Sequence, residues 1–206
     1  SESPGPRMSI DIGLTGNIAS GKSMISGMLQ EYGAAVLDVD LIGKRVLAEN
    51  VDGALDQVRT AFDNCIFEGN QLNRHLLGTL VFGHPDLLMK LNDIMVPIMT
   101  RLVVNGIRAL HQASTVVVLD AAILIEAGWQ NLVDEIWVVK ASKEDQLERL
   151  MTRDHLARDE AVSRIEAQIP LAEKLIYADV IIDNTMDAEQ TRRQVEILWK
   201  TRLQNH

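Results

Sequence analysis

The stretch Gly16-Asn17-Ile18-Ala19-Ser20-Gly21-Lys22-Ser23 decides the fold, because it has the form G-x4-G-K-S, in which a backbone loop encloses a phosphate group. Residues 9–15 before it are short, apolar and β-branched at intervals, which predicts a strand. Residues 21–32 after it carry apolar side chains at helical spacing, and Gly33 stands where a helix would end. A strand, a glycine-containing loop and a helix in this order predict a phosphate-binding loop.

Each residue type in this loop has a chemical role. Gly16 and Gly21 allow the backbone to turn tightly and approach phosphate oxygens. We expect the amides from Asn17 to Ser23 to converge on the β-phosphate, and Lys22 to reach the β- and γ-phosphates. The hydroxyl of Ser23 is expected to bind Mg²⁺. The motif predicts a nucleoside triphosphate with Mg²⁺ and leaves open what receives the phosphate.

The rest of the chain alternates between predicted strands and helices. Apolar, strand-like stretches recur at residues 35–39, 115–119, 135–139 and 180–182. Near-continuous apolar strands separated by helices predict an α/β fold with a parallel five-stranded sheet covered on both faces. Two long helical stretches interrupt the alternation, at residues 41–112, with a turn at Gly69-Asn70, and at residues 143–175. The last helix is predicted at residues 188–203. The predicted divisions are a core of residues 8–40, 113–142 and 176–206, a helical insertion at 41–112 and an Arg-rich lid at 143–175.

Composition narrows the class of protein. The 206 residues carry a net charge of −9, which disfavours non-specific binding to nucleic acid and requires any anionic ligand to meet locally gathered positive charge. No apolar stretch reaches the roughly 18 residues that cross a bilayer. A single cysteine, Cys65, excludes an internal disulfide framework and favours a cytoplasmic protein. Residues 1–7 are expected to be a vector-derived remnant before a natural start at Met8, with a short native extension as the alternative.

Acidic residues follow two of the predicted strands. Asp38 and Asp40 end the second strand at the edge of the sheet where ligands bind, and because they are two residues apart we expect them to share one strand face. A carboxylate there can accept the proton of an attacking hydroxyl. The alternative for Asp38 is a helix cap or turn. Asp120 follows the third strand, where a carboxylate typically holds Mg²⁺ through water, the alternative being a turn residue.

Positive charge is concentrated after the fourth strand. Arg149 and Arg153 are four residues apart and share a helix face, and Arg158 and Arg164 follow. Such a segment can close over a triphosphate and neutralise the charge that develops during transfer. The alternative is a salt-bridged surface helix, because acidic residues are interspersed.

At this point the sequence resembles the dephospho-CoA kinase family over essentially all of residues 8–206. The matching motifs are the phosphate loop, Leu37-Asp38-Val39-Asp40-Leu41-Ile42, Leu72-Asn73-Arg74, Ala122-Ile123-Leu124-Ile125-Glu126, Gln146-Leu147-Glu148-Arg149, Arg153, Arg164 with Ile165 and Gln168, and Ala178-Asp179-Val180-Ile181-Ile182-Asp183-Asn184. The sequence departs from the family's usual residues at Met24 (usually Thr), Val96 (usually His) and Ala122 (usually Pro).

The resemblance implies a P-loop NTPase-type fold and ATP-dependent phosphorylation of the ribose 3′-hydroxyl of dephospho-CoA, the last step of coenzyme A synthesis. It implies ATP and Mg²⁺ as cofactors, Asp40 as the base, Arg149 as the lid arginine, and Asn184 near the adenine. The implied ATP-binding residues are 16–24, Arg149, Arg153 and Asn184. The insertion would bind the acceptor, and the implied substrate residues are Asp38, Asp40, Arg74 and Glu126.

Two other functions remain open from the residues themselves. Another metabolite kinase, acting on shikimate or a nucleoside monophosphate, would share the loop, the nearby Asp and the Arg-rich lid. The other is a nucleotide-dependent switch with no acceptor metabolite. A guanine-specific switch would need an Asn-Lys-x-Asp element, and Val139-Lys140-Ala141-Ser142 lacks it. We expect a monomer or weak homo-oligomer that acts on a small molecule, with neither nucleic acid nor membrane as a partner.

Overall fold

The structure is a computed structural model that describes residues 9–206. The expectations about residues 1–7 and Met8 therefore lie outside the described residues. Among residues 9–206, no helix combines the length and the apolar character that crossing a membrane requires.

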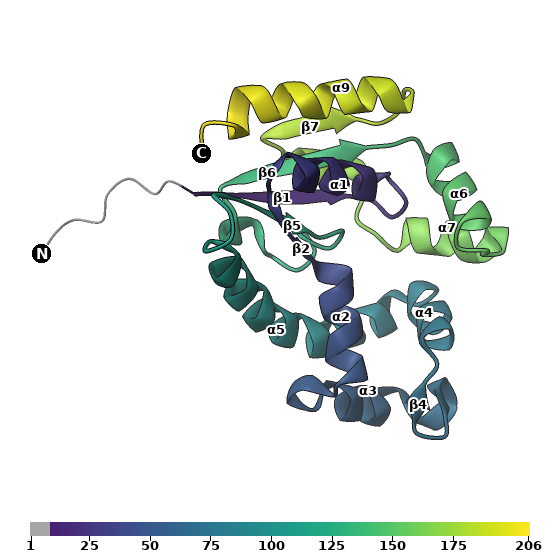
Figure 1. Cartoon of the computed structure of the whole chain (residues 1–206). Helices are drawn as coiled ribbons and strands as arrows, with labels where there is room; N and C mark the ends of the chain where they lie inside the picture. The colour runs from purple at the N-terminus through teal and green to yellow at the C-terminus, as the bar shows by residue number, and fades with distance from the viewer. Residues whose placement is uncertain (1–8) are drawn as a thin grey trace, which may run out of the picture.

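A five-stranded parallel sheet forms the centre of the molecule, in the order β2-β5-β1-β6-β7 (Figure 1). Its strands are β1 (Ile10–Gly16), β2 (Ala35–Asp38), β5 (Val116–Asp120), β6 (Glu135–Lys140) and β7 (Val180–Asp183). All five strand predictions are confirmed, with ends that differ by one or two residues. The phosphate loop leaves the carboxyl end of the central strand β1, so ligands at that edge can be reached from both neighbouring strands.

Alternating side chains on the strands build two separate cores. In β5, Val116 and Val118 join the core beneath α1 (Lys22–Tyr32) and α9 (Ala188–Leu198). Val117 and Leu119 point the other way and join the core beneath α5 (Pro85–Leu110). Helices therefore cover both faces of the sheet, as Figure 1 shows, and every strand residue of β5 is buried. This is the three-layer arrangement that the sequence predicts.

The insertion is mainly helical, and its helix α5 packs against the sheet. Its elements are α2 (Val39–Ala48), η1 (Val51–Gly53), α3 (Ala54–Phe62), η2 (Asn64–Ile66), β3 (Phe67–Glu68), β4 (Gln71–Leu72), α4 (Arg74–Phe82) and α5. The predicted turn at Gly69-Asn70 is confirmed, but it joins a short antiparallel hairpin, β3–β4, that the helical spacing did not predict. Val103 and Ile107 of α5 share one core with the sheet, so the insertion and the sheet pack as continuous layers.

Residues 143–175, which the sequence predicts as a lid and which keep that name below, lie beyond the carboxyl end of the sheet, at the right of Figure 1. The lid consists of α6 (Lys143–Thr152), α7 (Arg158–Glu166) and the short α8 (Leu171–Leu175), and the chain then returns to β7, α9 and a final π-helical turn, η4 (Trp199–Leu203). The lid has a small core of its own formed by Leu150, Leu156 and Ala161, and Ile18 and Ala19 of the phosphate loop pack against it. The lid and the loop therefore form one packed unit.

Candidate functional site

A cavity of about 460 Å³ opens at the carboxyl edge of the sheet, between the phosphate loop, the insertion and the lid. Its lining residues are Asn17 to Ser23 of the loop, Asp40 and Lys44 of α2, Ala122 after β5, and Arg149, Arg153, Asp154 and Arg164 of the lid segment. Five of these side chains are cationic and two are acidic, although the whole chain carries a net charge of −9. The local gathering of positive charge that an anionic ligand requires is therefore present.

The phosphate loop is held open by unusual backbone angles and by close packing from behind. Gly21 has φ 86°, and Ala19 also has a positive φ, 55°. A Cβ atom at Gly21 would collide with Nδ2 of Asn184, so glycine is required there by both conformation and space. Asn184, almost completely buried, donates from Nδ2 to the carbonyl oxygen of Ser20 at 2.8 Å. It thus supports the loop from behind and does not line the cavity.

Two glutamines of the lid segment form hydrogen bonds to the backbone at the tip of the loop. The N–H of Ile18 donates to Oε1 of Gln168 at 2.5 Å, and Nε2 of Gln146 donates to the carbonyl oxygen of Ile18 at 2.9 Å. The expectation that the Ile18 amide points at a phosphate is therefore wrong, because a protein group already accepts its proton. The amides from Gly21 to Ser23, at the positive start of α1, are the main candidate phosphate donors.

Lys22 and Asp120 meet at the base of the cavity. The ammonium of Lys22 is hydrogen-bonded to Oδ1 of Asp120, which is the last residue of β5 rather than the residue after it. Within residues 9–206 there is no group of three or more His, Cys, Asp or Glu side chains placed to hold a metal. Mg²⁺ in kinase sites commonly takes only one or two protein oxygens together with substrate phosphates. The hydroxyl of Ser23 and the carboxylate of Asp120 fit that donor set.

The segment with Asp38 and Asp40 differs from its prediction. The strand ends at Asp38, and Asp38 is the N-cap of α2, with its carboxylate accepting from the amides of Asp40 at 2.9 Å and Leu41 at 3.4 Å. Asp40 therefore lies in the first helical turn, and the two carboxylates do not share a strand face. The alternative assignment of Asp38 as a helix cap is confirmed. Asp40 itself lines the cavity.

The environment of Asp40 favours its neutral form more than water does. Burial among protein atoms raises the pKa of Asp40, Lys22 opposes that rise, and Asp38 and Asp120 add to it. The carboxyl nevertheless keeps an exposed surface, because it faces the open cavity. A carboxylate with a raised pKa is a better proton acceptor than an ordinary surface aspartate.

The lid arginines point into the cavity. Arg149 and Arg153 both line it, one helical turn apart at the end of α6. Nη1 of Arg149 donates to the carbonyl oxygen of Ala19 at 2.8 Å, which fixes the guanidinium beside the loop. Arg164 lines the same cavity and pairs with Glu160 at 3.2 Å, so the salt-bridged alternative describes Arg164 but not the placement of Arg149 and Arg153.

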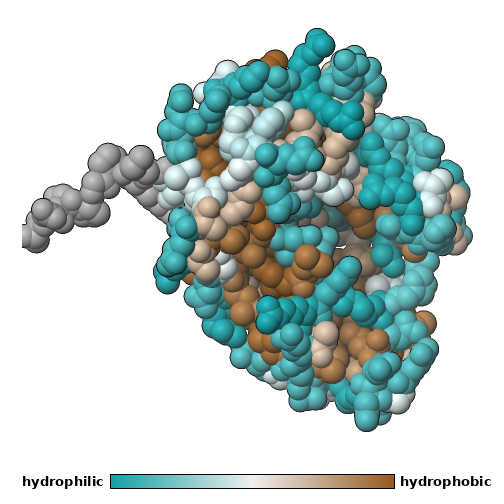
Figure 2. Space-filling model, viewed as in Figure 1, coloured by the Kyte–Doolittle hydropathy of each residue, from teal (hydrophilic) through white to brown (hydrophobic). Residues whose placement is uncertain are grey.

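A second cavity continues from Asp40 into the insertion. It has a volume of about 190 Å³, and its lining includes Asp40, Lys44, Arg74 and the apolar residues Leu91, Met95, Met99 and Ile123. A third, of about 310 Å³, shares Leu47 and Arg74 with it and lies against the β3–β4 hairpin. On the face seen in Figure 2, apolar residues reach the surface between the sheet and the insertion. Asp40, Lys44 and Arg74 thus lie together where the polar phosphate-loop cavity meets the apolar cavity of the insertion.

Six of the predicted site residues line none of these three cavities, among them Asn184 and Asp120, which contact Ser20 and Lys22 as described above. Gly16 and Met24 flank the loop, and Asp38 caps α2. Glu126 instead pairs with the buried Lys174 at 3.4 Å. Their predicted contacts with ligands remain predictions.

Sequence reasoning missed three residues of the site. Lys44 lies one helical turn after Asp40 and lines two cavities with it, but the i, i+4 spacing is informative only once α2 is known to begin at Val39. Gln146 and Gln168 belong to the matching motifs, yet nothing local in the sequence shows that they reach a loop more than a hundred residues away. Long-range pairing of this kind requires the fold.

Known proteins resemble the chain over nearly its whole length. A family model described as dephospho-CoA kinase matches residues 10–190. A dephospho-CoA kinase of Carboxydothermus hydrogenoformans is 44% identical over 193 residues, which are 92% of this chain and 94% of the relative. A dephospho-CoA kinase of Staphylococcus haemolyticus is 38% identical over 188 residues, 91% of this chain and 93% of the relative.

Solved structures agree with the sequence matches. A protein from Thermus thermophilus superposes with a TM-score of 0.75 at 31% identity, covering 93% of this chain and 97% of the other. A dephospho-CoA kinase from Campylobacter jejuni has a TM-score of 0.65 at 26% identity, covering 92% and 95%. A shikimate kinase from Bacteroides thetaiotaomicron, at 12% identity and a TM-score of 0.52, shares the P-loop NTPase-type fold alone. The chain belongs to the dephospho-CoA kinase family.

Proposed function

We propose that this chain transfers the γ-phosphoryl group of ATP to the ribose 3′-hydroxyl of dephospho-CoA, giving coenzyme A and ADP. The observation that carries the proposal is that Asp40 lines both the phosphate-loop cavity and the apolar cavity of the insertion. A hydroxyl that enters from the insertion side meets the carboxylate and the phosphate chain together. Family membership supports the choice of donor and acceptor.

On the nucleotide side, the loop and the lid supply the groups that bind ATP. The amides at the start of α1 and the ammonium of Lys22 face the cavity and are expected to bind the β- and γ-phosphates. Arg149, which is hydrogen-bonded to the loop, and Arg153 line the same cavity. As charge builds on the transferring oxygens, these guanidinium groups stabilise it more than they stabilise the ground state. Asn184 keeps the loop in shape beneath the nucleotide.

Mg²⁺ would be held by the Ser23 hydroxyl and, through water, by Asp120. When bound, the ion offsets negative charge on the β- and γ-phosphates. Asp120 in this structure is engaged by Lys22. The two side chains are therefore expected to separate when a nucleotide enters, because Lys22 then turns to the phosphates.

The transfer step releases one proton, and the chain needs one group to accept it. The 3′ oxygen forms a bond to the γ-phosphorus while the bond between that phosphorus and the β–γ bridging oxygen breaks, and ADP leaves with the electron pair. The hydroxyl proton passes to the carboxylate of Asp40, which the raised pKa makes a suitable acceptor. Transfer passes through a loose transition state, so the alignment that Asp40 gives the oxygen contributes as well as its basicity.

The acceptor is expected to lie along the second and third cavities. Lys44 and Arg74 supply positive charge where the diphosphate of dephospho-CoA would follow its ribose. Beyond them, Leu47, Leu55 and Leu72 offer apolar surface for the pantetheine arm. A shikimate-sized acceptor would leave this second half of the groove unused, which favours the larger acceptor.

The test is an acceptor panel. The purified protein is incubated with Mg-ATP and, separately, dephospho-CoA, adenosine, AMP and shikimate, and products are identified by mass spectrometry and ³¹P NMR. We expect phosphorylation of dephospho-CoA at the ribose 3′ position, with little reaction of the smaller acceptors. Preferential phosphorylation of another acceptor, or ATP hydrolysis with no acceptor product, would contradict the proposal. A Lys22→Ala variant, expected to lose transfer, controls for contaminating kinases.

We further propose that the protein works as a monomer or weak homo-oligomer on this small molecule, in the cytoplasm, without nucleic acid or membrane as a partner. The net charge of −9 opposes contact with polyanions. Sedimentation at several protein concentrations measures the oligomeric state. A stable larger assembly at micromolar concentration would contradict this proposal.

A further inference from the structure

Lys174, on α8 at the end of the lid segment, is a completely buried lysine with three oxygen atoms around its ammonium. Its exposed fraction is 0%. Its ammonium lies 2.7 Å from the carbonyl oxygen of Ala122, 3.5 Å from that of Gly16 and 3.4 Å from Oε1 of Glu126. Of these contacts, the one to Ala122 has the length of a normal hydrogen bond, the one to Gly16 is long, and the one to Glu126 is an ion pair. This geometry fixes the side chain in one position.

The two carbonyls belong to the segments that carry the phosphate site. Gly16 ends β1 and begins the phosphate loop, six residues before Lys22. Ala122 lies two residues after Asp120, the partner of Lys22, and itself lines the main cavity. The hydroxyl of Thr15 also donates to the carbonyl of Ala122, at 3.2 Å. Lys174 therefore joins the root of the loop to the segment after β5 from the side opposite the ligand.

Such a buried cation has an energetic cost. Burial lowers the pKa of Lys174, Glu126 counteracts this, and the nearby charge of Lys22 lowers it further. Apolar residues often replace buried ion pairs without loss of stability. A charge retained here, beneath a phosphate site, is thus better explained by what it positions than by the stability it adds.

We propose that Lys174 is a positioning residue for phosphoryl transfer: it sets the spacing between the phosphate loop and the segment after β5, and so keeps Lys22 and Asp120 in productive relation. The role rests on the proposed function of the site. Lys174 lines none of the three cavities described above and acts through Gly16 and Ala122. Because α8 belongs to the lid segment, the same contact anchors the base of the lid to the loop.

The test compares Lys174→Met, which keeps the length of the side chain and removes the ammonium, with Lys143→Met. Lys143 is exposed on α6, so the control removes the same charge from the same lid segment. For K174M we expect kcat to fall about 10²-fold, as for a small misplacement of reacting groups, with a KM for ATP close to that of the wild type. We also expect the gain in ADP affinity on adding Mg²⁺, measured by calorimetry, to disappear. K143M should match the wild type in both measurements.

A double variant separates positioning from folding. Lys174→Met leaves the partly buried carboxylate of Glu126 unpaired, so K174M/E126Q should recover part of the lost thermal stability. If Lys174 positions the site, kcat stays low in the double variant while circular dichroism shows it folded at the assay temperature. Recovery of kcat together with stability would overturn the proposal, as would a wild-type kcat in K174M. A wild-type protein that does not phosphorylate dephospho-CoA would instead overturn the proposed function. The effect of Mg²⁺ on ADP affinity in K174M would still show whether Lys174 positions the phosphate site.

Discussion

Asp40 lies on the first turn of α2, at the point where the phosphate-loop cavity meets the cavity of the insertion. Asp38 places it there, because its carboxylate caps the amides of Asp40 and Leu41 and starts the helix. Burial then raises its pKa, with Lys22 opposing the effect. One aspartate therefore builds the helix start and the other faces the ligand.

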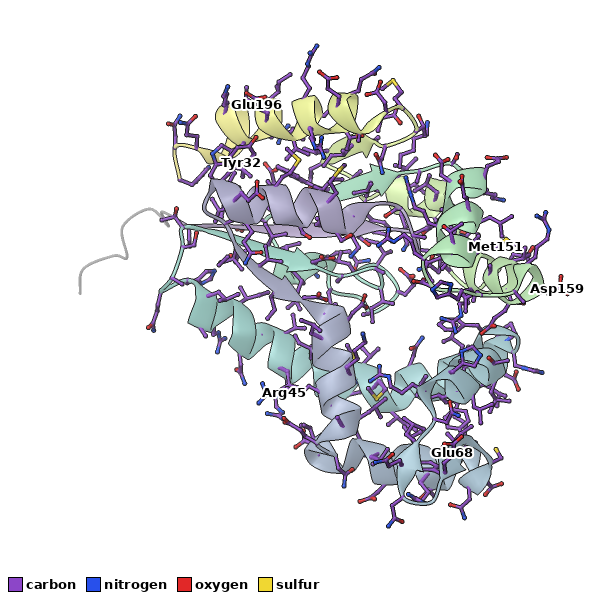
Figure 3. The ribbon with its side chains drawn as sticks, turned by 45° about the vertical axis from the view of Figure 1, so that its right-hand side comes forward. Tyr32, Arg45, Glu68, Met151, Asp159 and Glu196 are labelled. Carbon is purple, nitrogen blue, oxygen red and sulfur yellow. The ribbon has the colours of Figure 1, made fainter. Side chains whose placement is uncertain are left out.

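Replacing Asp40 with Asn should separate activity from stability. Loss of the proton acceptor is expected to lower kcat by roughly 10² to 10⁴-fold, with ATP affinity nearly unchanged. The melting temperature should stay equal or rise, because a carboxyl whose pKa is raised by folding destabilises the fold when ionised. Steady-state kinetics and thermal denaturation measure the two effects. Asp159→Asn, at an exposed lid position, is the matched control (Figure 3), and wild-type turnover in D40N would remove Asp40 from the mechanism.

The pH profile should carry the signature of the same group. Activity needs ionised Asp40, so kcat should fall as the pH drops through its raised pKa, at a pH above the ordinary aspartate value of about 3.9. The free energy of unfolding should change with pH in the opposite sense. Ionised Asp40 lowers it by the full amount at pH values above the folded-state pKa, and this loss vanishes at pH values below the unfolded-state pKa. A profile of kcat against pH that keeps the same acidic limb in D40N would assign that limb to another group.

At the scale of single residues, the sequence predicts which residues belong to the site better than it predicts where their side chains point. The loop residues, Asp40 and the lid arginines were all expected near one ligand, and the structure brings them to one cavity. The expected strand face shared by Asp38 and Asp40 was wrong, because the capping carboxylate ends the strand earlier. Capping and strand continuation compete locally, and spacing alone does not decide between them.

The phosphate loop and the lid form a unit at the scale of elements. Gln146 and Gln168 bond both polar groups of the Ile18 backbone, and Arg149 bonds the carbonyl of Ala19. The apolar side of the loop tip packs into the core of the lid. A lid attached in this way cannot move far from the loop without breaking these contacts. The sequence predicts the helices of the lid, but their contacts with the loop depend on the tertiary fold.

Gln168→Leu should weaken that unit. The Ile18 amide would lose its acceptor, so we expect a KM for ATP about 10-fold higher, consistent with the loss of one buried hydrogen bond. Hydrogen exchange should also become faster at residues 17–20 than in the wild type. Gln204→Leu, exposed after η4, serves as the control. If Q168L leaves both the hydrogen exchange of residues 17–20 and the KM for ATP unchanged, the hydrogen bond from Ile18 to Gln168 is not needed to hold the loop.

Across the whole molecule, the lid and the insertion contact each other directly. Glu160 of α7 accepts a hydrogen bond from Thr79 of α4 at 3.1 Å, and Arg164 lies over the ring of Phe82 at 5.1 Å. Figure 3 shows the lid helices, with Met151 and Asp159 labelled, above the insertion that carries Glu68. The bridge joins the lid to the insertion at Arg164, which lines the phosphate-loop cavity.

Glu160→Ala should loosen this bridge and also remove the ion-pair partner of Arg164. We expect a KM for dephospho-CoA raised about 3 to 10-fold, the scale of one or two modest hydrogen bonds, and a smaller rise in the KM for ATP, because Arg164 also lines the phosphate-loop cavity. The comparison is Glu166→Ala, an exposed position on the same helix. An equal loss in both variants, or a change confined to ATP, would assign Glu160 to another role.

The global architecture is the part that the sequence predicts most fully. Apolar strands between helices imply a covered parallel sheet, and the sheet order follows from neither spacing nor composition. The β3–β4 hairpin escaped prediction because two-residue strands are too short for a periodic signal. The continuity of the cavities depends on how α2, α4 and α5 pack, which is a property of the assembled fold.

The central claim is that Asp40 directs the ribose 3′ oxygen of dephospho-CoA in line with the γ-phosphorus held by the phosphate loop. A crystal structure with a non-hydrolysable ATP analogue, Mg²⁺ and dephospho-CoA measures this directly. The account predicts the 3′ oxygen within hydrogen-bonding distance of the Asp40 carboxylate and opposite the bridging oxygen of the analogue. A 3′ oxygen bound elsewhere, with Asp40 turned away from both ligands, would contradict it.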